Sequence, residues 1–416
     1  MTANSSTTAS RPHLLALDGF RFIAAACVMA SHGYWYLIPL QHSENVGRFG
    51  STVINLAPIG MTLFFVLSGF VIHFNYSESI RQEGGIRHFF AARFSRLYPL
   101  FLVVFIVEVF RASVGSGYAV IPEVGIARPA AFFLTFTESW WFFPLGPINA
   151  AGAFGGVTGL MWSLSTEAFF YVCYPLVAPA LRKLCGKRLL VYIVGISIVT
   201  AALPLVIGHF RPSIDSWAIA RFGRMPGIAF YDWLTFNSPW VRIFEFLIGA
   251  GAAQACAVLK VRPQVGSLGV AAMVLALGLY LHPPIAGLTT TTLSPLFALA
   301  ICSVAVTRTR FSAVLSSRVM VVGGEASYSL YLLHYFIMHD LGVGAVTDAK
   351  LFSRIIMYFV LMVASVHIAR LSYLYFERPS MRWLRAVLDR RPVVHMPVPG
   401  AMLIVERGRT SEADGI

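Results

Sequence analysis

The stretch LDGFRFIAAACVMASH, residues 17–32, decides the fold because it is mostly apolar and yet carries three ionisable side chains. The run approaches the roughly 20 apolar residues with which an α-helix crosses a bilayer. An ionisable side chain at the bilayer centre costs about 2.5–3.5 kcal/mol on insertion scales. A helix that served only as an anchor would not retain Asp18, Arg21 and His32. The stretch therefore predicts a membrane helix with a functional face.

The composition extends this interpretation to the whole chain. Of the 416 residues, 57% are hydrophobic and 12% are charged, whereas about 25% are charged in an average soluble domain. A soluble protein of this size could not hide so much apolar surface. We therefore expect an all-α, polytopic membrane helical bundle that has membrane lipid as a partner.

Apolar runs along the chain predict about ten transmembrane helices. They cover residues 17–38, 54–75, 93–111, 158–180, 189–209, 240–259, 265–282, 288–306, 325–344 and 352–374. The aromatic segment 130–147 is short and flanked by proline, so we expect it to be interfacial or re-entrant. Most Lys and Arg residues fall in loops that are cytoplasmic if the N-terminus is inside. This bias predicts both termini in the cytoplasm and a multi-pass protein of the cell inner membrane.

Charge and cysteine usage exclude other classes of protein. The net charge of +13 does not indicate a nucleic-acid partner, because the basic residues lie in short loops and form no patch. The five cysteines lie far apart without metal-type spacing, so we expect no disulfide, no metal and no permanently bound cofactor. We expect a disordered cytoplasmic N-terminus at residues 1–13 and a cytoplasmic C-terminal tail at 381–416.

Helical periodicity places two of the first span's side chains on one face. Arg21 and His32 are separated by close to three full turns, so they point the same way, about 16 Å apart along the axis. Asp18 precedes Arg21 by three residues and can neighbour it. The structural alternative is an interfacial Arg–Asp pair with a histidine that reaches outward, but the alignment on one face favours a functional site.

The third span begins with RHFFAARFSRLYPL, in which Arg93 and Arg96 share one face at the cytoplasmic edge. Two guanidinium groups held in this way can bind phosphates in bidentate fashion. The alternative is ordinary anchoring by basic residues at the cytoplasmic side.

Polar side chains also interrupt three later spans. Glu167, in GLMWSLSTEAFFYVCYPL, falls near mid-span and must be paired, protonated or functional. Tyr331 and His334, in GGEASYSLYLLHYFIMHD, belong to a polar stripe at helical spacing. In VRIFEFLIGAG, Arg242 and Glu245 are three residues apart, and we interpret them as a structural pair.

These segments, in this order, resemble the recurrent segments of membrane-bound acyltransferase family 3, which O-acylates sugars and other hydroxylated acceptors. The similar stretches are ALDGFRFIAAACVMASH, FFVLSGFVI, RFSRLYPL, WSLSTEAFFYVCYPL, EFLIGA, ASYSLYLLHYFI and YFERP. In that family an Arg or Lys followed by a His, with ten residues between them, is a signature of the first span; here it falls on Arg21 and His32. The Arg-x-x-Arg signature falls on Arg93 and Arg96. The resemblance implies an acyltransferase domain at 14–380.

The resemblance also implies an acyl-CoA donor, with acetyl as the default acyl group, and a glycan or other hydroxylated acceptor. We expect the donor's phosphates to bind Arg93 and Arg96, helped by Arg87. A hydroxyl group is a poor nucleophile at neutral pH, and we assign His32 as the general base that takes its proton.

The remaining site residues have supporting roles in this hypothesis. We expect Arg21 to support the donor or the developing negative charge. Either Glu167 or His334 would orient His32 or the acceptor. Tyr331 and Asp18 complete the expected substrate-binding residues.

Two other functions remain open from the sequence. A secondary transporter or acyl-donor permease would also place charges within a bundle, although the chain has no visible half-symmetry. A partner protein that only scaffolds glycan assembly would tolerate loss of His32. Some family members carry a C-terminal esterase domain of the SGNH type. This chain ends too soon for one, so we expect the membrane domain or a separate glycan-assembly protein to complete the transfer.

Overall fold

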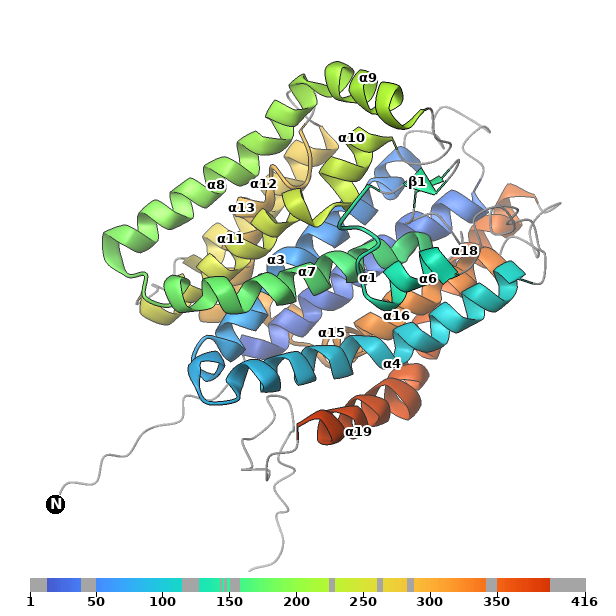
Figure 1. Cartoon of the computed structure of the whole chain (residues 1–416). Helices are drawn as coiled ribbons and strands as arrows, with labels where there is room; N and C mark the ends of the chain where they lie inside the picture. Colours follow the sequence, from blue (N-terminus) through green and yellow to red (C-terminus); the bar gives the residue numbers. More distant parts are fainter. Residues whose placement is uncertain are drawn as a thin grey trace, which may run out of the picture.

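The protein is described by a computed structural model at residues 13–38, 50–113, 127–142, 144–145, 148–149, 158–223, 229–259, 265–282, 288–341 and 350–389. Within these ranges it is helical apart from one pair of two-residue strands, β1 (Pro144–Leu145) and β2 (Ile148–Asn149), which pair antiparallel. The predicted all-α class is confirmed (Figure 1). Most of the predicted termini, residues 1–12 and 390–416, lie outside the described ranges.

Long helices alternate with short ones along the chain. The long helices are α1 (His13–Leu37), α3 (Leu56–Tyr76), α4 (Gly85–Ser113), α7 (Thr158–Leu181), α8 (Gly186–His209), α11 (Pro239–Val258), α12 (Val265–Leu281) and α18 (Leu351–Ser372). The shorter α-helices are α6 (Ala127–Leu134), α9 (Arg211–Phe222), α10 (Phe230–Asp232), α13 (Ser294–Val306), α14 (Arg310–Leu315), α15 (Arg318–Glu325), α16 (Ser327–Tyr335) and α19 (Arg378–Leu388). A 3₁₀ turn, η1, covers Ser79–Arg81, and three π-helical segments cover η3 (Trp233–Asn237), η4 (Phe336–Leu341) and η5 (Tyr373–Glu377).

In the described part of the chain, seven helices are long and apolar enough to cross a membrane, as expected of a multi-pass membrane protein. They cover Leu15–Trp35, Gly50–Tyr76, Gly85–Arg111, Gly159–Leu181, Gly186–His209, Phe230–Val258 and Leu351–Leu388. Each overlaps a predicted span, although the third and sixth begin earlier than predicted and the seventh ends later. The other three predicted spans fall on shorter helices: 265–282 on α12, 288–306 on α13, and 325–344 on α16 with η4. The total of ten and the side of each terminus stay predictions.

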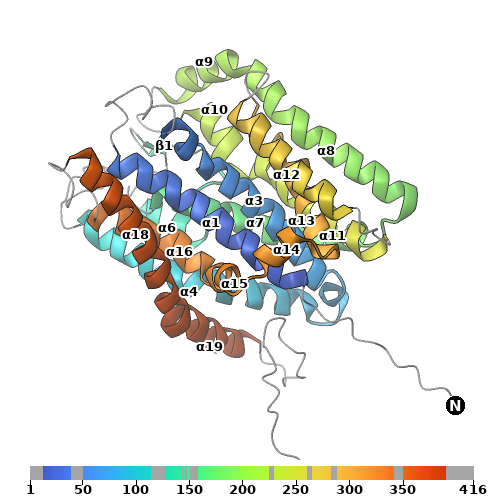
Figure 2. The same cartoon turned by 180° about the vertical axis from the view of Figure 1, so that it is seen from behind.

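Two helices, α1 and α3, run through the middle of the bundle, while α8 and α18 lie at opposite margins (Figures 1 and 2). Helix α3 packs between α1 and α11. Gly69 and Gly249 make its contact with α11 possible, because a Cβ on either would lie 1.9 Å from a carbonyl oxygen of the other helix. Small residues allow membrane helices to approach in this way. The close packing fixes the position of α3, which lines the functional site.

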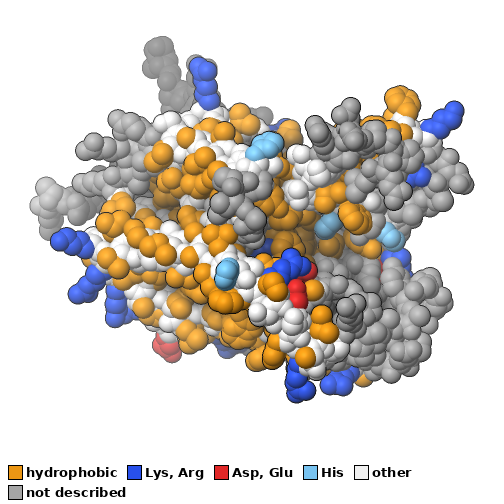
Figure 3. All heavy atoms as spheres, turned by 90° about the horizontal axis from the view of Figure 1, so that it is seen from above, with side chains coloured by type: hydrophobic (Ala, Val, Ile, Leu, Met, Phe, Trp, Pro, Cys, Tyr) orange, Lys and Arg blue, Asp and Glu red, His pale blue; other side chains and the backbone are white. Residues whose placement is uncertain are grey.

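The marginal helices leave broad apolar surfaces exposed. Leu190 and Val191 on α8 and Phe352 on α18 are exposed, the last by 73%. Seen from above, the surface is largely hydrophobic, and most Lys and Arg side chains lie at its edges (Figure 3). In a chain that crosses the membrane, this surface meets lipid tails and needs no further protein to cover it.

The predicted Arg242–Glu245 pair forms a fully buried salt bridge of 2.6 Å near the start of α11. The Arg242 guanidinium also donates to the Thr291 hydroxyl at 2.9 Å, and the Glu245 carboxylate accepts from Thr62 and Thr291 at 3.1 and 2.6 Å. These contacts join α11 to α3 and to the turn before α13. The geometry agrees with the structural role that we predicted.

The aromatic segment 130–147 does not form a continuous span in its described residues. Helix α6 ends at Leu134, and Phe136 turns the chain with a φ of 54°. Ser139 then bonds to Ser165 and Thr166 of α7, at 2.9 and 3.1 Å. An eight-residue helix is too short to cross a bilayer. The prediction that this segment is not an eleventh span therefore holds for its described part.

The expectation of no disulfide is wrong. Cys256 of α11 and Cys302 of α13 form a disulfide, although 46 residues separate them in the sequence. The two helices pack side by side, and this contact, which sequence spacing does not reveal, brings the sulfur atoms together. The other three cysteines are free.

Candidate active site

A narrow polar cavity of about 90 Å³ lies within the bundle, between α1, α3, α4, α7 and α16. It follows α3 from Ile72 to Met61, which corresponds to about 16 Å along the helix axis. Polar residues line it among apolar ones: Arg21, Ser68, Arg93, Arg96, Ser163, Glu167, Ser327, Tyr328 and Tyr331. Five of the nine predicted site residues therefore face one cavity, although they come from four helices.

Arg93 is held in the cavity wall by aromatic rings. Its Nη2 donates to the Tyr76 hydroxyl at 3.0 Å, and its guanidinium lies 5.0 Å from the Tyr76 ring centre and 5.9 Å from that of Tyr171. Its buried Nε has no hydrogen-bond partner among the described residues. The donor is therefore available to a ligand, while the charge is stabilised by the ring faces.

The other two arginines differ in their partners. Arg21 forms an ion pair with Asp18 at 2.5 Å, one turn earlier on α1, as the spacing predicted. Arg96 makes no hydrogen bond or ion pair to any described residue, although it faces the same cavity. An unpaired guanidinium inside a membrane protein is costly. The cavity is therefore suited to an anionic ligand.

Glu167 is engaged on the cavity wall. Its Oε1 accepts from Ser68 on α3 at 3.1 Å and from Tyr171, one turn later on α7, at 2.5 Å. Neither bond leads to His32. Of the two residues that we expected to orient His32, the structure brings only His334 into contact with it.

His32 and His334 meet across the interface between α1 and α16. His32 Nδ1 lies 3.0 Å from His334 Nε2, and the two ring planes are 11° apart. His334 is fully buried, and its Nδ1 lies 3.1 Å from the carbonyl oxygen of Leu330. The next residue on α1, Gly33, packs against η4, where a Cβ on it would lie 2.9 Å from the Met338 sulfur.

Tyr331 lines the cavity and contacts the histidine pair. Its hydroxyl bonds to Ser163 Oγ at 2.6 Å and to the Leu160 carbonyl at 2.8 Å, and its ring centre lies 6.1 Å from that of His334. Neither histidine is among the residues that line the cavity. Tyr331 therefore lines the cavity and also lies beside the ring of His334, which connects the arginines and the histidines as adjoining parts of one site.

Arg87 lies elsewhere. Its Nη2 donates to the Leu388 carbonyl at the end of α19, and the next residue, His88, pairs with Asp389. It does not line the cavity, so the structure separates this predicted helper from Arg93 and Arg96.

Sequence reasoning missed Ser68, Tyr76 and Tyr171. Tyr171 follows Glu167 by four residues, a spacing at which helical side chains meet, so this partner could have been found. Ser68 and Tyr76 carried no such signal, because their partners are on other helices. Within the described ranges, no group of three or more His, Cys, Asp or Glu side chains is placed to hold a metal ion.

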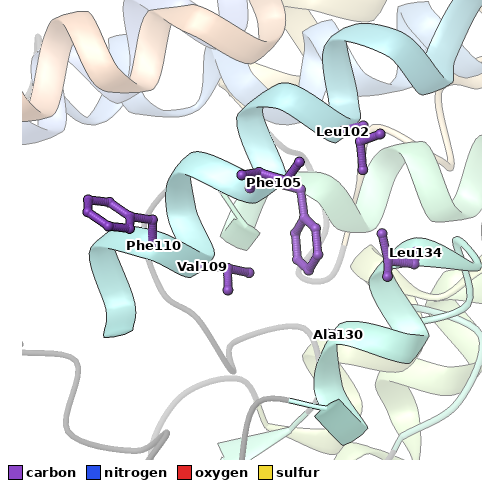
Figure 4. Close-up of a pocket in the computed structure, with 7 residues that line it drawn as sticks. Leu102, Phe105, Val109, Phe110, Ala130 and Leu134 are labelled. Carbon is purple, nitrogen blue, oxygen red and sulfur yellow. The ribbon is translucent and has the colours of Figure 1, made fainter. Parts of the chain in front are cut away.

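A second hollow, of about 460 Å³, lies between α4 and α6. Only apolar side chains line it, among them Leu102, Phe105, Val109 and Leu134 (Figure 4). It offers no group for acid–base chemistry or for binding a charged ligand. The polar cavity and the adjoining histidines are therefore the candidate active site.

The chain is similar to three proteins, two of which are named for acyl transfer. Acyltransferase MdmB of Streptomyces mycarofaciens is 28% identical over 93% of this chain and 95% of its own length. The peptidoglycan O-acetyltransferase OatA of Listeria monocytogenes is 28% identical over 47% of this chain and 29% of its own length. Nodulation protein 10 of Rhizobium leguminosarum is 28% identical over 42% of this chain and 47% of its own length. No solved structure matches the chain significantly.

A family model described as an acyltransferase domain matches residues 14–373, which include the cavity and both histidines. The match covers most of the chain and contains every quoted segment except the last, YFERP, which follows its end. The chain therefore belongs to acyltransferase family 3 and is a multi-pass membrane acyltransferase.

Proposed function

We propose that this enzyme moves an acyl group, acetyl by default, from acyl-CoA to a hydroxyl group of a glycan or glycosylated acceptor. The observation that carries the proposal is the convergence of Arg21, Arg93 and Arg96 on one cavity among membrane helices. Coenzyme A carries several phosphate groups, and guanidinium groups bind phosphates through charge-assisted hydrogen bonds. The names of two relatives support acyl transfer as the reaction.

The histidine pair supplies the acid–base chemistry in this proposal. His32 takes the proton of the acceptor hydroxyl as its oxygen attacks the thioester carbonyl. The new C–O bond forms, the C–S bond breaks, and the leaving thiolate takes the proton back from the imidazolium. The products are the acylated acceptor and free coenzyme A, and the enzyme returns to its starting state. Arg21 lies about 16 Å from His32 along the helix axis, so it supports the donor together with Arg93 and Arg96.

The two substrates would reach the site from opposite faces of the cell inner membrane. The donor would enter from the cytoplasm, past Arg93 and Arg96, and the acceptor would come from outside. Asp18 holds Arg21 in place, and Glu167 and Tyr331 line the path of the acyl chain. The acceptor belongs to one of three classes, namely an exported polysaccharide, a lipid-linked glycan or a small glycosylated metabolite, with separate glycan-assembly proteins as partners.

The test uses the full chain in lipid nanodiscs with [1-¹⁴C]acetyl-CoA and one acceptor of each class. We expect label on one acceptor and release of an equal amount of coenzyme A thiol. His32→Ala should lower transfer at least about 100-fold, because general-base catalysis contributes roughly 10²–10⁴-fold. His367→Ala, on the exposed face of α18, is the matched control and should retain full activity. Unchanged transfer by His32→Ala would remove His32 from the mechanism.

The full chain in sealed lipid vesicles distinguishes an enzyme from a permease. Reconstituted vesicles that accumulate labelled acetyl-CoA in their lumen, and acylate none of the acceptors, would contradict the proposal and support transport.

A further inference from the structure

We infer that His334 is a positioning residue that fixes the tautomer of His32. The inference rests on the proposed function, because it concerns the residue that is proposed there as the general base. A neutral imidazole has one N–H and one lone pair, and only the nitrogen with the lone pair can accept a proton. The two possible tautomers of His32 therefore differ in which nitrogen can act as the base.

The chain of contacts begins at a backbone carbonyl. The carbonyl oxygen of Leu330 has no proton to give, so the contact of 3.1 Å with His334 Nδ1 requires Nδ1 to be the donor. His334 Nε2 in the neutral ring is then an acceptor. Since it lies 3.0 Å from His32 Nδ1, that nitrogen must carry the proton of His32. The lone pair of His32 is left on Nε2, the nitrogen turned away from His334.

The surroundings keep this arrangement fixed. His334 is fully buried, and within the described structure its ring contacts Tyr331 and His32 while its Nδ1 is taken by Leu330. Among the side chains that the structure describes, no carboxylate bonds to either histidine, and Glu167 bonds to Ser68 and Tyr171 instead. A neutral histidine here does what a carboxylate does in hydrolase triads: it orients the base and selects its tautomer.

The arrangement has a consequence for the reaction. When His32 Nε2 takes the acceptor's proton, the imidazolium carries protons on both nitrogens, and its Nδ1–H still donates to His334. The pair therefore needs no rearrangement between proton uptake and proton return to the thiolate. Removal of His334 would free His32 to adopt the other tautomer, in which Nε2 carries the proton and cannot act as a base.

Two substitutions separate positioning from packing. His334→Leu removes the acceptor for His32 Nδ1 and keeps an apolar side chain in the core. His334→Gln retains a hydrogen-bond acceptor at the end of the side chain. We expect His334→Leu to lower kcat at least about 100-fold with an unchanged KM for acetyl-CoA, because the arginine cavity is untouched. His334→Gln should recover most of this loss. His367→Leu, on the lipid-facing side of α18, is the matched histidine control.

A spectroscopic measurement reads the tautomer without any reaction. ¹⁵N NMR of the full chain with labelled histidines gives separate signals for protonated and unprotonated ring nitrogens, and the difference from His32→Gln assigns those of His32. We expect an unprotonated Nε2 in the wild type and the loss of this preference in His334→Leu. A protonated Nε2 in the wild type, or a kcat for His334→Leu equal to that of the wild type, would overturn the inference. An active His32→Ala with an unprotonated His32 Nε2 in the wild type would instead overturn the proposed function alone.

Discussion

Arg96 lines the cavity without a hydrogen bond or ion pair to another described residue, so Arg96→Gln removes a ligand-binding group without breaking a contact of the fold. Its charge lies close enough to repel Arg21 and to attract the buried carboxylate of Glu377. Because these two effects oppose each other, we expect the substitution to weaken donor binding while the unfolding temperature changes little. Arg93→Gln, in contrast, also breaks the hydrogen bond to Tyr76 and two ring contacts. We expect this substitution to lower both the affinity for the donor and the unfolding temperature.

The expected change in KM follows from the loss of one guanidinium group. A hydrogen bond to a charged partner contributes about 1.5–3 kcal/mol. Since about 1.4 kcal/mol corresponds to a tenfold change in affinity, the KM for acetyl-CoA should rise roughly 10- to 140-fold. The rate at saturating donor should change little, because the histidine pair is intact.

The assay measures thiol release against acetyl-CoA concentration in nanodiscs, with thermal unfolding of the same samples. Arg318→Gln, an exposed arginine at the start of α15, is the matched control for the loss of one positive charge. A KM for Arg96→Gln equal to that of the control would refute the assignment of this cavity to the donor. A large fall in unfolding temperature would refute the claim that Arg96 is not needed for folding.

Three further predictions concern stability and are read by thermal unfolding. Arg242→Leu leaves Glu245 buried without its cation and should destabilise the protein by about 3–5 kcal/mol; an unchanged unfolding temperature would contradict a structural role. Gly249→Val should separate α3 from α11, because its Cβ would meet the Val66 carbonyl at 1.9 Å, whereas the same change at the exposed Gly195, which has open space around it, should be tolerated. Burial raises the pKa of Glu138 well above its ordinary range. The protonated Glu138 side chain therefore contributes to the free energy of unfolding at low pH, and this contribution is lost as the pH rises through the raised pKa. Glu138→Gln should abolish this pH dependence.

The sequence predicts where lipid-facing helices occur better than where they end. Hydropathy placed a span at 288–306, but α13 begins only at Ser294. The preceding threonines form side-chain hydrogen bonds outside any helix. Thr290 bonds to Thr62 of α3, Thr291 bonds to Glu245 of α11, and Thr289 bonds to Thr292. A run of threonines is apolar enough to be counted in a span, and its hydroxyl groups are what hold it in a turn.

The contacts of the site are of two kinds: those within one helix could be predicted from the sequence, and those between distant helices could not. The common face of Arg21 and His32, and the pairing of Arg21 with Asp18, follow from helical geometry and could be predicted. The contact between His32 and His334 joins positions 302 residues apart, and depends on how closely α1 and α16 pack. Periodicity assigns a side chain to a face of its own helix, but it does not say which helix that face will meet.

The separation of the arginines from the histidines has a physical reason. A base that works near neutral pH must be neutral before the reaction, and three nearby guanidinium groups would disfavour any imidazolium that forms. The anionic part of the donor, in contrast, needs those groups. Among the described residues, the arginines line the cavity and the two histidines do not, while Tyr331 lines the cavity and lies beside His334. A donor that binds with its phosphates among the arginines must therefore extend its acyl thioester along the cavity toward Tyr331 to reach His32.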